Sequence, residues 1–98
     1  MNYTVYILQS FKNDRHYIGH TNNMEYRLWQ HNTGKVKSTK GYLPWKIIYT
    51  EVYKTKSEAY KRELEIKSYK GGILFKRLIG QFNKIMRLIK KTNQLLKY

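Results

Sequence analysis

The chain has 98 residues, of which 41% are hydrophobic and 27% charged, so its apolar side chains suffice for one modest core. It carries 20 Lys and Arg against 6 Asp and Glu, a formal net charge of +14, which makes a polyanion the expected partner. A ribosome-associated or membrane-surface basic protein would have a similar charge. Cysteine is absent, which excludes disulfides, cysteine-ligated zinc and a thiol nucleophile.

The sequence contains no basic segment followed by an apolar signal region, and no run of about 18 apolar residues. We therefore expect a soluble, cytoplasmic protein without a membrane partner. Ten tyrosines are more than core packing usually needs. Several of them are expected to present a hydroxyl to a ligand or to stack on bases, although the edge of an amphipathic core would also use them.

The first segment predicts an antiparallel hairpin. Residues 3–8 and 16–19 are rich in β-branched and aromatic side chains, and an Asn-Asp turn signal lies between them. Strand alternation places Thr4, Tyr6 and Leu8 on one face of the sheet.

A helix follows the hairpin. Thr21, Asn22 or Asn23 can cap its beginning, and it runs to about residue 33. Gly34 is a natural residue for the left-handed position after the last turn. Residues 35–46 then predict a polar loop, and residues 46–53 a third strand.

A second helix begins at the capping box Thr55-Lys56-Ser57-Glu58 and runs to about residue 69. Gly71 and Gly72 interrupt the chain, residues 73–79 predict a short apolar helix, and Gly80 precedes a basic amphipathic stretch over 81–97. We expect residues 1–80 to form one domain and residues 81–98 a basic helix that packs on it or extends it. A dimer interface is the alternative role of this tail.

Glu63 is the most notable carboxylate in the sequence. At about 100° per residue it lies within an apolar arc of the second helix that is formed by Ala59, Tyr60, Leu64 and Ile66. Glu58, Lys61, Arg62 and Glu65 lie on the opposite side. A carboxylate on a packing face needs a cation or several donors, which a divalent metal or Lys67 would supply. The alternative is a surface Glu63–Lys67 ion pair.

Arg27 and His31 are four residues apart and therefore share one side of the first helix. Arginine is suited to bidentate contact with phosphate, and a neutral imidazole can accept a proton or orient a phenol. A solvated helix face is the alternative interpretation.

Tyr6 and Tyr17 lie on adjacent predicted strands and can be neighbours across them. A phenol is a poor base at neutral pH unless its phenolate is stabilised, which Arg27, a metal ion or the surrounding lysines would do. Packing over the sheet is the alternative role of both rings. Gly19 at the end of the second strand allows close approach of another group.

The loop after the first helix predicts a phosphate-contacting surface, because lysines alternate there with small and aromatic residues. These lysines are Lys35, Lys37, Lys40 and Lys46. His16 and His20 flank the triplet Tyr17-Ile18-Gly19, but no third ligand is spaced to join them at a metal.

Together these features resemble the GIY-YIG nuclease domain. The resemblance covers roughly residues 2–79, in the runs VYIL…HYIGHTNNMEYRLWQHNTGK and PWKIIYTEVYKTKSEAYKRELEIK. They contain the two triplets Val-Tyr-Ile and Tyr-Ile-Gly, then Arg-x-x-x-His, Pro-Trp and Ala-x-x-Arg-Glu-x-x-Ile-Lys. The chain is most similar to the small stand-alone bacterial members, which are themselves similar to the N-terminal nuclease module of the excision-repair incision subunit.

The resemblance implies an α+β fold with a three-stranded antiparallel sheet flanked by helices, and metal-dependent endonuclease activity that hydrolyses DNA. By position, Tyr6 and Tyr17 would be the motif tyrosines and Arg27 the phosphate-binding residue. His31 would accept a proton, and Glu63 would hold a single Mg²⁺ or Mn²⁺. Our hypothesis assigns Tyr6 as the residue that activates the attacking water.

The resemblance also implies that Gly19 and His20 lie close to the nucleic acid. Val5 stands in place of the first motif glycine, His20 where larger members often carry Lys, and Phe75 where many carry Asn. We expect a DNA partner, branched or damaged, with a role in DNA repair and without a small-molecule cofactor. A nucleic-acid-binding protein with little turnover and an RNA-associated basic protein are the alternatives, and the oligomeric state is open.

Overall fold

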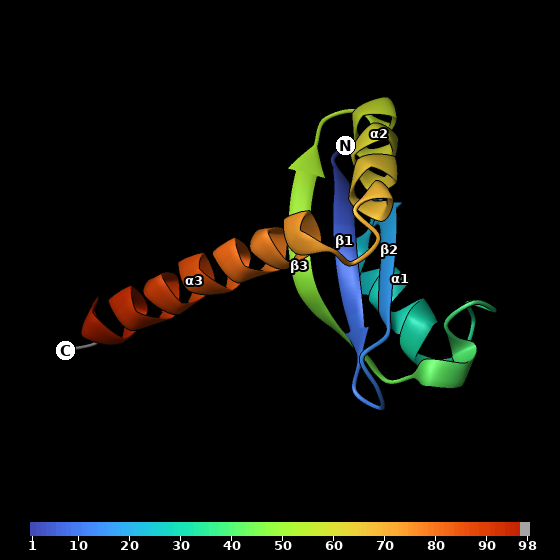
Figure 1. The fold of residues 1–98 in the computed structure, drawn as a ribbon, viewed down its shortest axis with the longest axis horizontal. Coiled ribbons are helices and arrows are strands. Elements are labelled where there is room, and N and C mark those ends of the chain that lie inside the picture. The colour runs from blue at the N-terminus through green and yellow to red at the C-terminus, as the bar shows by residue number, and fades with distance from the viewer. Residues whose placement is uncertain (97–98) are drawn as a thin grey trace. The chain divides into compact units, whose positions relative to one another are not determined.

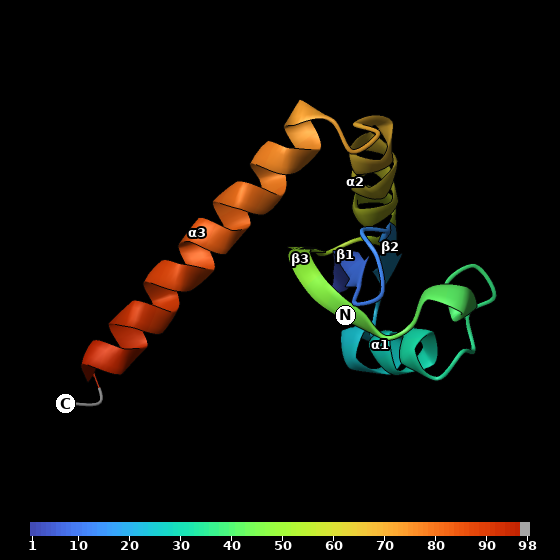
Figure 2. The same ribbon diagram turned by 60° about the horizontal axis from the view of Figure 1, so that its bottom comes forward.

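The computed structural model describes residues 1–96, with the backbone course alone over 93–96. Two compact units are present, Met1–Ser68 and a second that begins at Tyr69. In the first unit, strands β1 (Tyr3–Ser10), β2 (His16–Thr21) and β3 (Trp45–Tyr53) form an antiparallel sheet in the order β2-β1-β3. Helices α1 (Met24–Asn32) and α2 (Lys56–Ser68) lie on opposite faces of this sheet (Figure 1 and Figure 2). The predicted α+β fold is confirmed.

The central strand β1 forms the core of the first unit. Residues 5–8 of this strand are fully buried, because α1 and α2 cover its two faces. Tyr6 and Leu8 pack with Trp45 on the α1 face, and Met24 and Leu28 of α1 complete that cluster. The strand alternation predicted for this face is therefore confirmed.

Both ends of α1 follow the capping signals in the sequence. Of the three candidate caps the structure selects Asn23, whose side chain accepts a hydrogen bond from the Tyr26 amide at 3.1 Å. Gly34 has a φ of 75°, the left-handed conformation expected after the helix. The loop that follows contains a short 3₁₀ helix, η1 (Lys40–Tyr42), before β3 begins at Trp45.

Asn32 fastens the end of α1 to the beginning of β3. Its side-chain amide donates to the Trp45 carbonyl at 3.0 Å, and its side-chain oxygen accepts from the Trp45 amide at 2.6 Å. The side chain therefore pairs with Trp45 as a neighbouring strand would. This double contact fixes the last turn of α1, where His31 lies.

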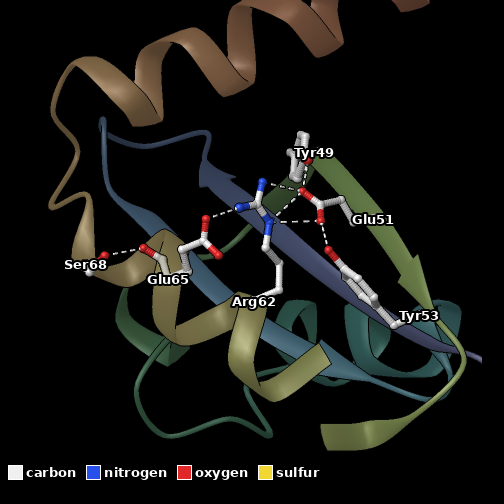
Figure 3. Close-up of polar contacts among 6 residues, drawn as sticks. All are labelled: Tyr49, Glu51, Tyr53, Arg62, Glu65 and Ser68. Carbon is white, nitrogen blue, oxygen red and sulfur yellow. Dashed lines mark hydrogen bonds and ion pairs between the residues drawn. The ribbon is translucent and has the colours of Figure 1, made fainter. Parts of the chain in front are cut away.

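A cluster of charges and phenols fastens α2 to β3 (Figure 3). The Arg62 Nε donates to both Glu51 oxygens at 3.0 Å, and Tyr49 and Tyr53 donate to the same carboxylate. Arg62 also pairs with Glu65 at 2.6 Å. Arg62 was predicted to lie opposite the apolar arc of α2, and the edge strand β3 supplies a carboxylate within reach of its long side chain.

The buried side of α2 is narrower than the predicted arc. Ala59 and Ile66 are fully buried and Glu63 lies with them, but Tyr60 and Leu64 are exposed. The capping box is confirmed, because the Glu58 amide donates to the Thr55 hydroxyl at 3.2 Å.

The second unit consists of a turn and one long helix. Lys70 and Gly71 have φ values of 50° and 70°, and α3 (Ile73–Leu96) then runs through Gly80 without interruption. The predicted end of the short apolar helix at residue 79 is wrong, because apolar residues keep their helical spacing across Gly80 and one glycine costs a helix only about 1 kcal/mol. Residues 97 and 98, the end of the predicted tail 81–98, lie outside the described part of the chain. The packing of this tail on residues 1–80 stays a prediction. None of the helices within residues 1–96 has the length and apolarity needed to cross a bilayer.

We expect Asn32→Ala to lower the free energy of unfolding by about 1–3 kcal/mol, because two hydrogen bonds with the Trp45 backbone are lost at a partly buried position. Urea denaturation followed by circular dichroism measures the change. Asn13→Ala in the exposed β1–β2 turn, where the asparagine accepts from the Arg15 amide, is the control and should cost less than about 1 kcal/mol. Equal losses in the two variants would contradict the role assigned to Asn32.

Candidate active site

Three of the predicted site residues, Tyr6, Tyr17 and His31, come together on the α1 face of the sheet. Tyr6 lies opposite Gly19 in the β1–β2 ladder and Tyr17 opposite Leu8, so the two tyrosines are diagonal neighbours with ring centroids 6.2 Å apart. The His31 ring from α1 meets both of them edge-on, with its centroid 4.8 Å from that of Tyr17 and 5.8 Å from that of Tyr6.

Gly19 leaves the space that the Tyr6 phenol occupies. A Cβ atom at this position would lie 2.6 Å from the Tyr6 hydroxyl oxygen and 2.8 Å from its ring carbon Cζ. Both distances are shorter than van der Waals contact, so any side chain here would displace the phenol. Gly19 is therefore needed to leave room for the phenol of Tyr6, a candidate catalytic residue, and not to form a turn.

A buried chain of hydrogen bonds runs from Tyr6 to the loop after α1. The Tyr6 hydroxyl lies 2.9 Å from His31 Nε2, and His31 Nδ1 lies 2.8 Å from the Thr39 hydroxyl. Thr39 in turn donates to the Val36 carbonyl at 3.3 Å, so its oxygen accepts from a protonated Nδ1. Nε2 then carries the lone pair, and Tyr6 donates its proton to it. Sequence reasoning missed Thr39, because nothing local distinguishes it from Ser38.

Burial sets the protonation states of His31 and Tyr6. It lowers the pKa of His31 to about 4, and the positive charge of Arg27 acts in the same direction. Burial also raises the pKa of Tyr6 to about 12, although a hydrogen bond from Arg27 opposes the rise. At neutral pH the imidazole is therefore neutral, and the phenol holds its proton beside a free acceptor.

Arg27 lies at the partly exposed side of the same group. Its Nε donates to the Tyr6 hydroxyl at 3.4 Å, and its Nη1 donates to the Gln30 side chain at 3.1 Å. A guanidinium has five N–H donors, so further ones are available to an anion that approaches the phenol.

Glu63 does not join this group, because it lies on α2, on the other face of the sheet (Figure 2). Its residue is only 8% exposed, and its two oxygens pair with His20 Nδ1 and Lys67 Nζ, each at 2.7 Å. Both interpretations that the sequence left open are thus present in part, since Glu63 is buried on the packing face and also pairs with Lys67. The negative charge of Glu63 also acts across the sheet. Burial is the main cause of the raised pKa of Tyr6, and Tyr17 and then Glu63 add smaller contributions in the same direction.

The remaining predicted contact residues make contacts outside the group of Tyr6, Tyr17 and His31. His20 bonds Glu63, and its ring meets the Tyr60 ring edge-on at 5.9 Å. Three of the lysines are exposed in the loop after α1, whereas Lys46 in β3 lies over the Phe11 ring at 5.2 Å. The three are Lys35, Lys37 and Lys40.

No metal cage of three or more His, Cys, Asp or Glu side chains is present in the described part of the chain. Glu63 nevertheless fits one hard divalent cation, because Mg²⁺ keeps several waters and is often held by one or two carboxylates together with substrate phosphates. The half-exposed Lys67 now supplies the positive charge that a cation would bring to this buried carboxylate.

Comparison with known proteins gives concordant matches. The GIY-YIG catalytic domain matches residues 2–72. A UPF0213 protein of Staphylococcus haemolyticus is 44% identical over 66 residues, which span 66% of this chain and 79% of the relative. A UPF0213 protein of Oceanobacillus iheyensis is 44% identical over 64 residues, 64% of this chain and 73% of the relative. The solution NMR structure of a UPF0213 protein from Bacillus halodurans shares 35% identity over 69% of this chain and 72% of its own, with a TM-score of 0.43.

We expect Gly19→Ala to destabilise the fold by about 1–3 kcal/mol, because the added methyl group overlaps the Tyr6 phenol in a packed core. Gly41→Ala is the matched control, since a Cβ there meets no atom within 4 Å. Urea denaturation of both variants measures the difference. A Gly19→Ala protein as stable as the Gly41→Ala protein would show that the phenol does not need this space.

We expect the stability of the protein to fall as the pH is lowered from about 6.5 towards 4. The unfolded chain binds a proton at His31 near pH 6.5, but the folded protein does so only near pH 4, so protonation favours unfolding by up to about 3 kcal/mol. His31→Gln should remove most of this slope in urea denaturation between pH 7 and 4.5. His16→Gln is the control. Partial burial also lowers the pKa of this histidine, but His16 is exposed and lies outside the buried chain of hydrogen bonds. An unchanged slope in His31→Gln would contradict the assignment.

Proposed function

Because the chain belongs to the GIY-YIG catalytic domain family, we propose that it is a metal-dependent endonuclease that hydrolyses phosphodiester bonds in DNA. The observation that carries this proposal is the buried Tyr6–His31 hydrogen bond with Arg27 on the phenol. A packing role for Tyr6 would not need a hydroxyl bonded to both an imidazole and a guanidinium.

Tyr6 and His31 together provide a route for a proton. When water attacks the phosphorus, its proton passes to the Tyr6 oxygen while the phenol proton passes to the free Nε2 of His31. The bond from phosphorus to the departing sugar oxygen breaks, and that oxygen takes a proton from solvent. The phenol need not ionise beforehand, which suits a group whose pKa burial raises to about 12. Thr39 holds the imidazole in the tautomer that accepts this proton. Tyr17 lies against the imidazole ring and confines it.

Arg27 is placed to bind the phosphate next to the phenol. Its free N–H groups can contact the phosphate oxygens, whose negative charge increases in the transition state. Since the guanidinium also bonds the Tyr6 hydroxyl, it places the reacting phosphate beside the proton acceptor.

Glu63 is the residue that would hold the Mg²⁺ or Mn²⁺ ion, with waters and the phosphate as its other ligands. A divalent cation bound there supplies positive charge to the phosphate and favours deprotonation of nearby water. The two halves of the proposed site meet at the edge strand β2, where Gly19 faces Tyr6 and the next residue, His20, bonds Glu63. With a cation on Glu63, His20 would orient the carboxylate, and the cation would take the place of Lys67.

The exposed lysines of the loop after α1, with Lys46, are proposed to contact the phosphates that flank the cut bond. The net charge of +14 supports a nucleic-acid substrate. A role in repair of branched or damaged DNA, and hence a cytoplasmic location in a bacterial cell, belongs to the same proposal. Structured RNA is the competing substrate.

A second candidate function is nucleic-acid binding without turnover. The observation that favours it is that both oxygens of Glu63 are already paired, one with His20 and the other with Lys67. If Lys67 holds its place in the presence of metal, the carboxylate is a structural ion pair.

We expect the protein to cleave supercoiled and branched DNA in Mg²⁺ or Mn²⁺. Tyr6→Phe should lower the cleavage rate about 10²- to 10⁴-fold, because the proton route is lost, and Glu63→Gln should abolish metal-dependent cleavage. Gel assays with labelled DNA measure the rates, and a matched structured RNA tests the competing substrate.

Tyr3→Phe and Glu25→Gln are the matched controls for these two variants. Tyr3 lies on the same strand as Tyr6 but on the other face, and Glu25 is an exposed carboxylate of α1. Both should cleave at the wild-type rate. Equal background nicking by the wild type and by Glu63→Gln would leave only the binding protein.

A further inference from the structure

Two large aromatic side chains lie together on the surface of α1. Tyr26 is 55% and Trp29 51% exposed, and their rings are stacked with centroids 5.7 Å apart and planes inclined by 19°. Single exposed apolar residues are common on protein surfaces, but tryptophan is on average strongly buried. Here one turn of a helix presents two aligned rings to water.

The direction of α1 explains why these rings point outwards. Met24 and Leu28 pack against the core cluster, and His31 is fully buried, so these positions define the inner side of the helix. At about 100° per residue, Tyr26 and Trp29 fall on the outer side. Folding of the first unit therefore leaves about half of each residue's surface available to a partner.

The surroundings of the pair indicate an anionic partner. Arg27, the proposed phosphate ligand, donates to the Gln30 side chain at 3.1 Å, and Gln30 lies one turn on from Tyr26. Glu25 is the one acidic residue of α1, and the exposed lysines at positions 35, 37 and 40 follow the end of the helix. Positive charge on this helix and in the loop after it, together with exposed aromatic rings, matches a molecule that carries both phosphates and flat aromatic faces. A nucleotide with an unpaired base has both properties, whereas bases within a continuous duplex already stack on their neighbours.

We propose that Tyr26 and Trp29 form a stacking surface for an unpaired base of the nucleic acid that binds at Arg27. The proposal rests on the proposed action on nucleic acid and specifies its substrate class. The protein would prefer single-stranded or branched segments to continuous duplex, because only an unpaired base can leave its neighbours and stack on the rings.

The two tryptophans of the chain make this contact directly measurable. Trp29 is half exposed but Trp45 is only 3% exposed, so a ligand that stacks on α1 changes the emission of Trp29 alone. We expect oligothymidylate, added to the full chain in EDTA, to quench tryptophan emission. A duplex of equal length, closed at both ends by a non-nucleotide ethylene glycol linker so that it contains no unpaired base, should quench it much less. Trp29→Phe should abolish the quenching but retain binding, because phenylalanine still offers a ring.

Affinity measurements on alanine variants test the energetic contribution. Trp29→Ala and Tyr26→Ala should each weaken binding of oligothymidylate about 5- to 150-fold and leave binding of the closed duplex unchanged. Val52→Ala, which shortens an exposed apolar side chain of β3, is the control and should change neither affinity. Urea denaturation of each variant verifies that the fold is intact.

Three results would overturn the proposal. The first is Trp29→Ala binding single strands as tightly as wild type, and the second is an equal loss for single strands and closed duplex. The third is a change of oligomeric state in Trp29→Ala on sedimentation, which would assign the rings to a contact between two copies. If these occur while the wild type still cleaves DNA, the endonuclease proposal stands. A wild-type chain that binds no nucleic acid would overturn both.

Discussion

The hydroxyl of Tyr6 is the constraint on which the rest of the site depends. The strand that carries it is the middle one of three and is covered on both faces, so this oxygen has little access to water. A buried hydroxyl must be hydrogen-bonded, and His31 and Arg27 meet that need. Their positions follow from the ends of α1, because Asn23 fixes where the helix begins and Asn32 ties its last turn to β3. A requirement for hydrogen bonding in the core thus produces the arrangement that the proposed chemistry uses.

Glu63 meets a different constraint on the other face of the sheet. The direction of α2 is held by Arg62, whose guanidinium is bonded to Glu51 of β3, while the next residue points its carboxylate at His20 of β2. The helix is therefore fastened to both edge strands by two consecutive residues of opposite charge. Such attachment limits rotation of α2 about its axis, and a ligand held by a single carboxylate depends on that orientation.

Local sequence signals predicted the framework of this fold, because each signal was sufficient to identify one strand face or one helix end without knowledge of tertiary contacts. Strand alternation placed Tyr6, and the side chain of Asn23 and the conformational freedom of Gly34 marked the ends of α1. The residues that were missed depend on tertiary partners. Thr39 is identified only by its bond to His31, and Asn32 only by its pairing with Trp45. The pairing of Arg62 with Glu51 was missed because helical periodicity contains no information about the neighbouring strand. The short apolar helix was predicted to end at residue 79, although propensity is a weak constraint within an amphipathic helix.

The absence of a side chain at Gly19 has a consequence for how sequences of this kind can diverge. With the Tyr6 phenol 2.6 Å from the place of a Cβ atom, neither position can drift independently of the other. A lineage that gives up the phenol is released from the glycine, and one that acquires a side chain there must first lose or move the phenol. A relative that keeps both residues would therefore keep the phenol in this place, and a relative with only one of them would have lost either the phenol or the space for it.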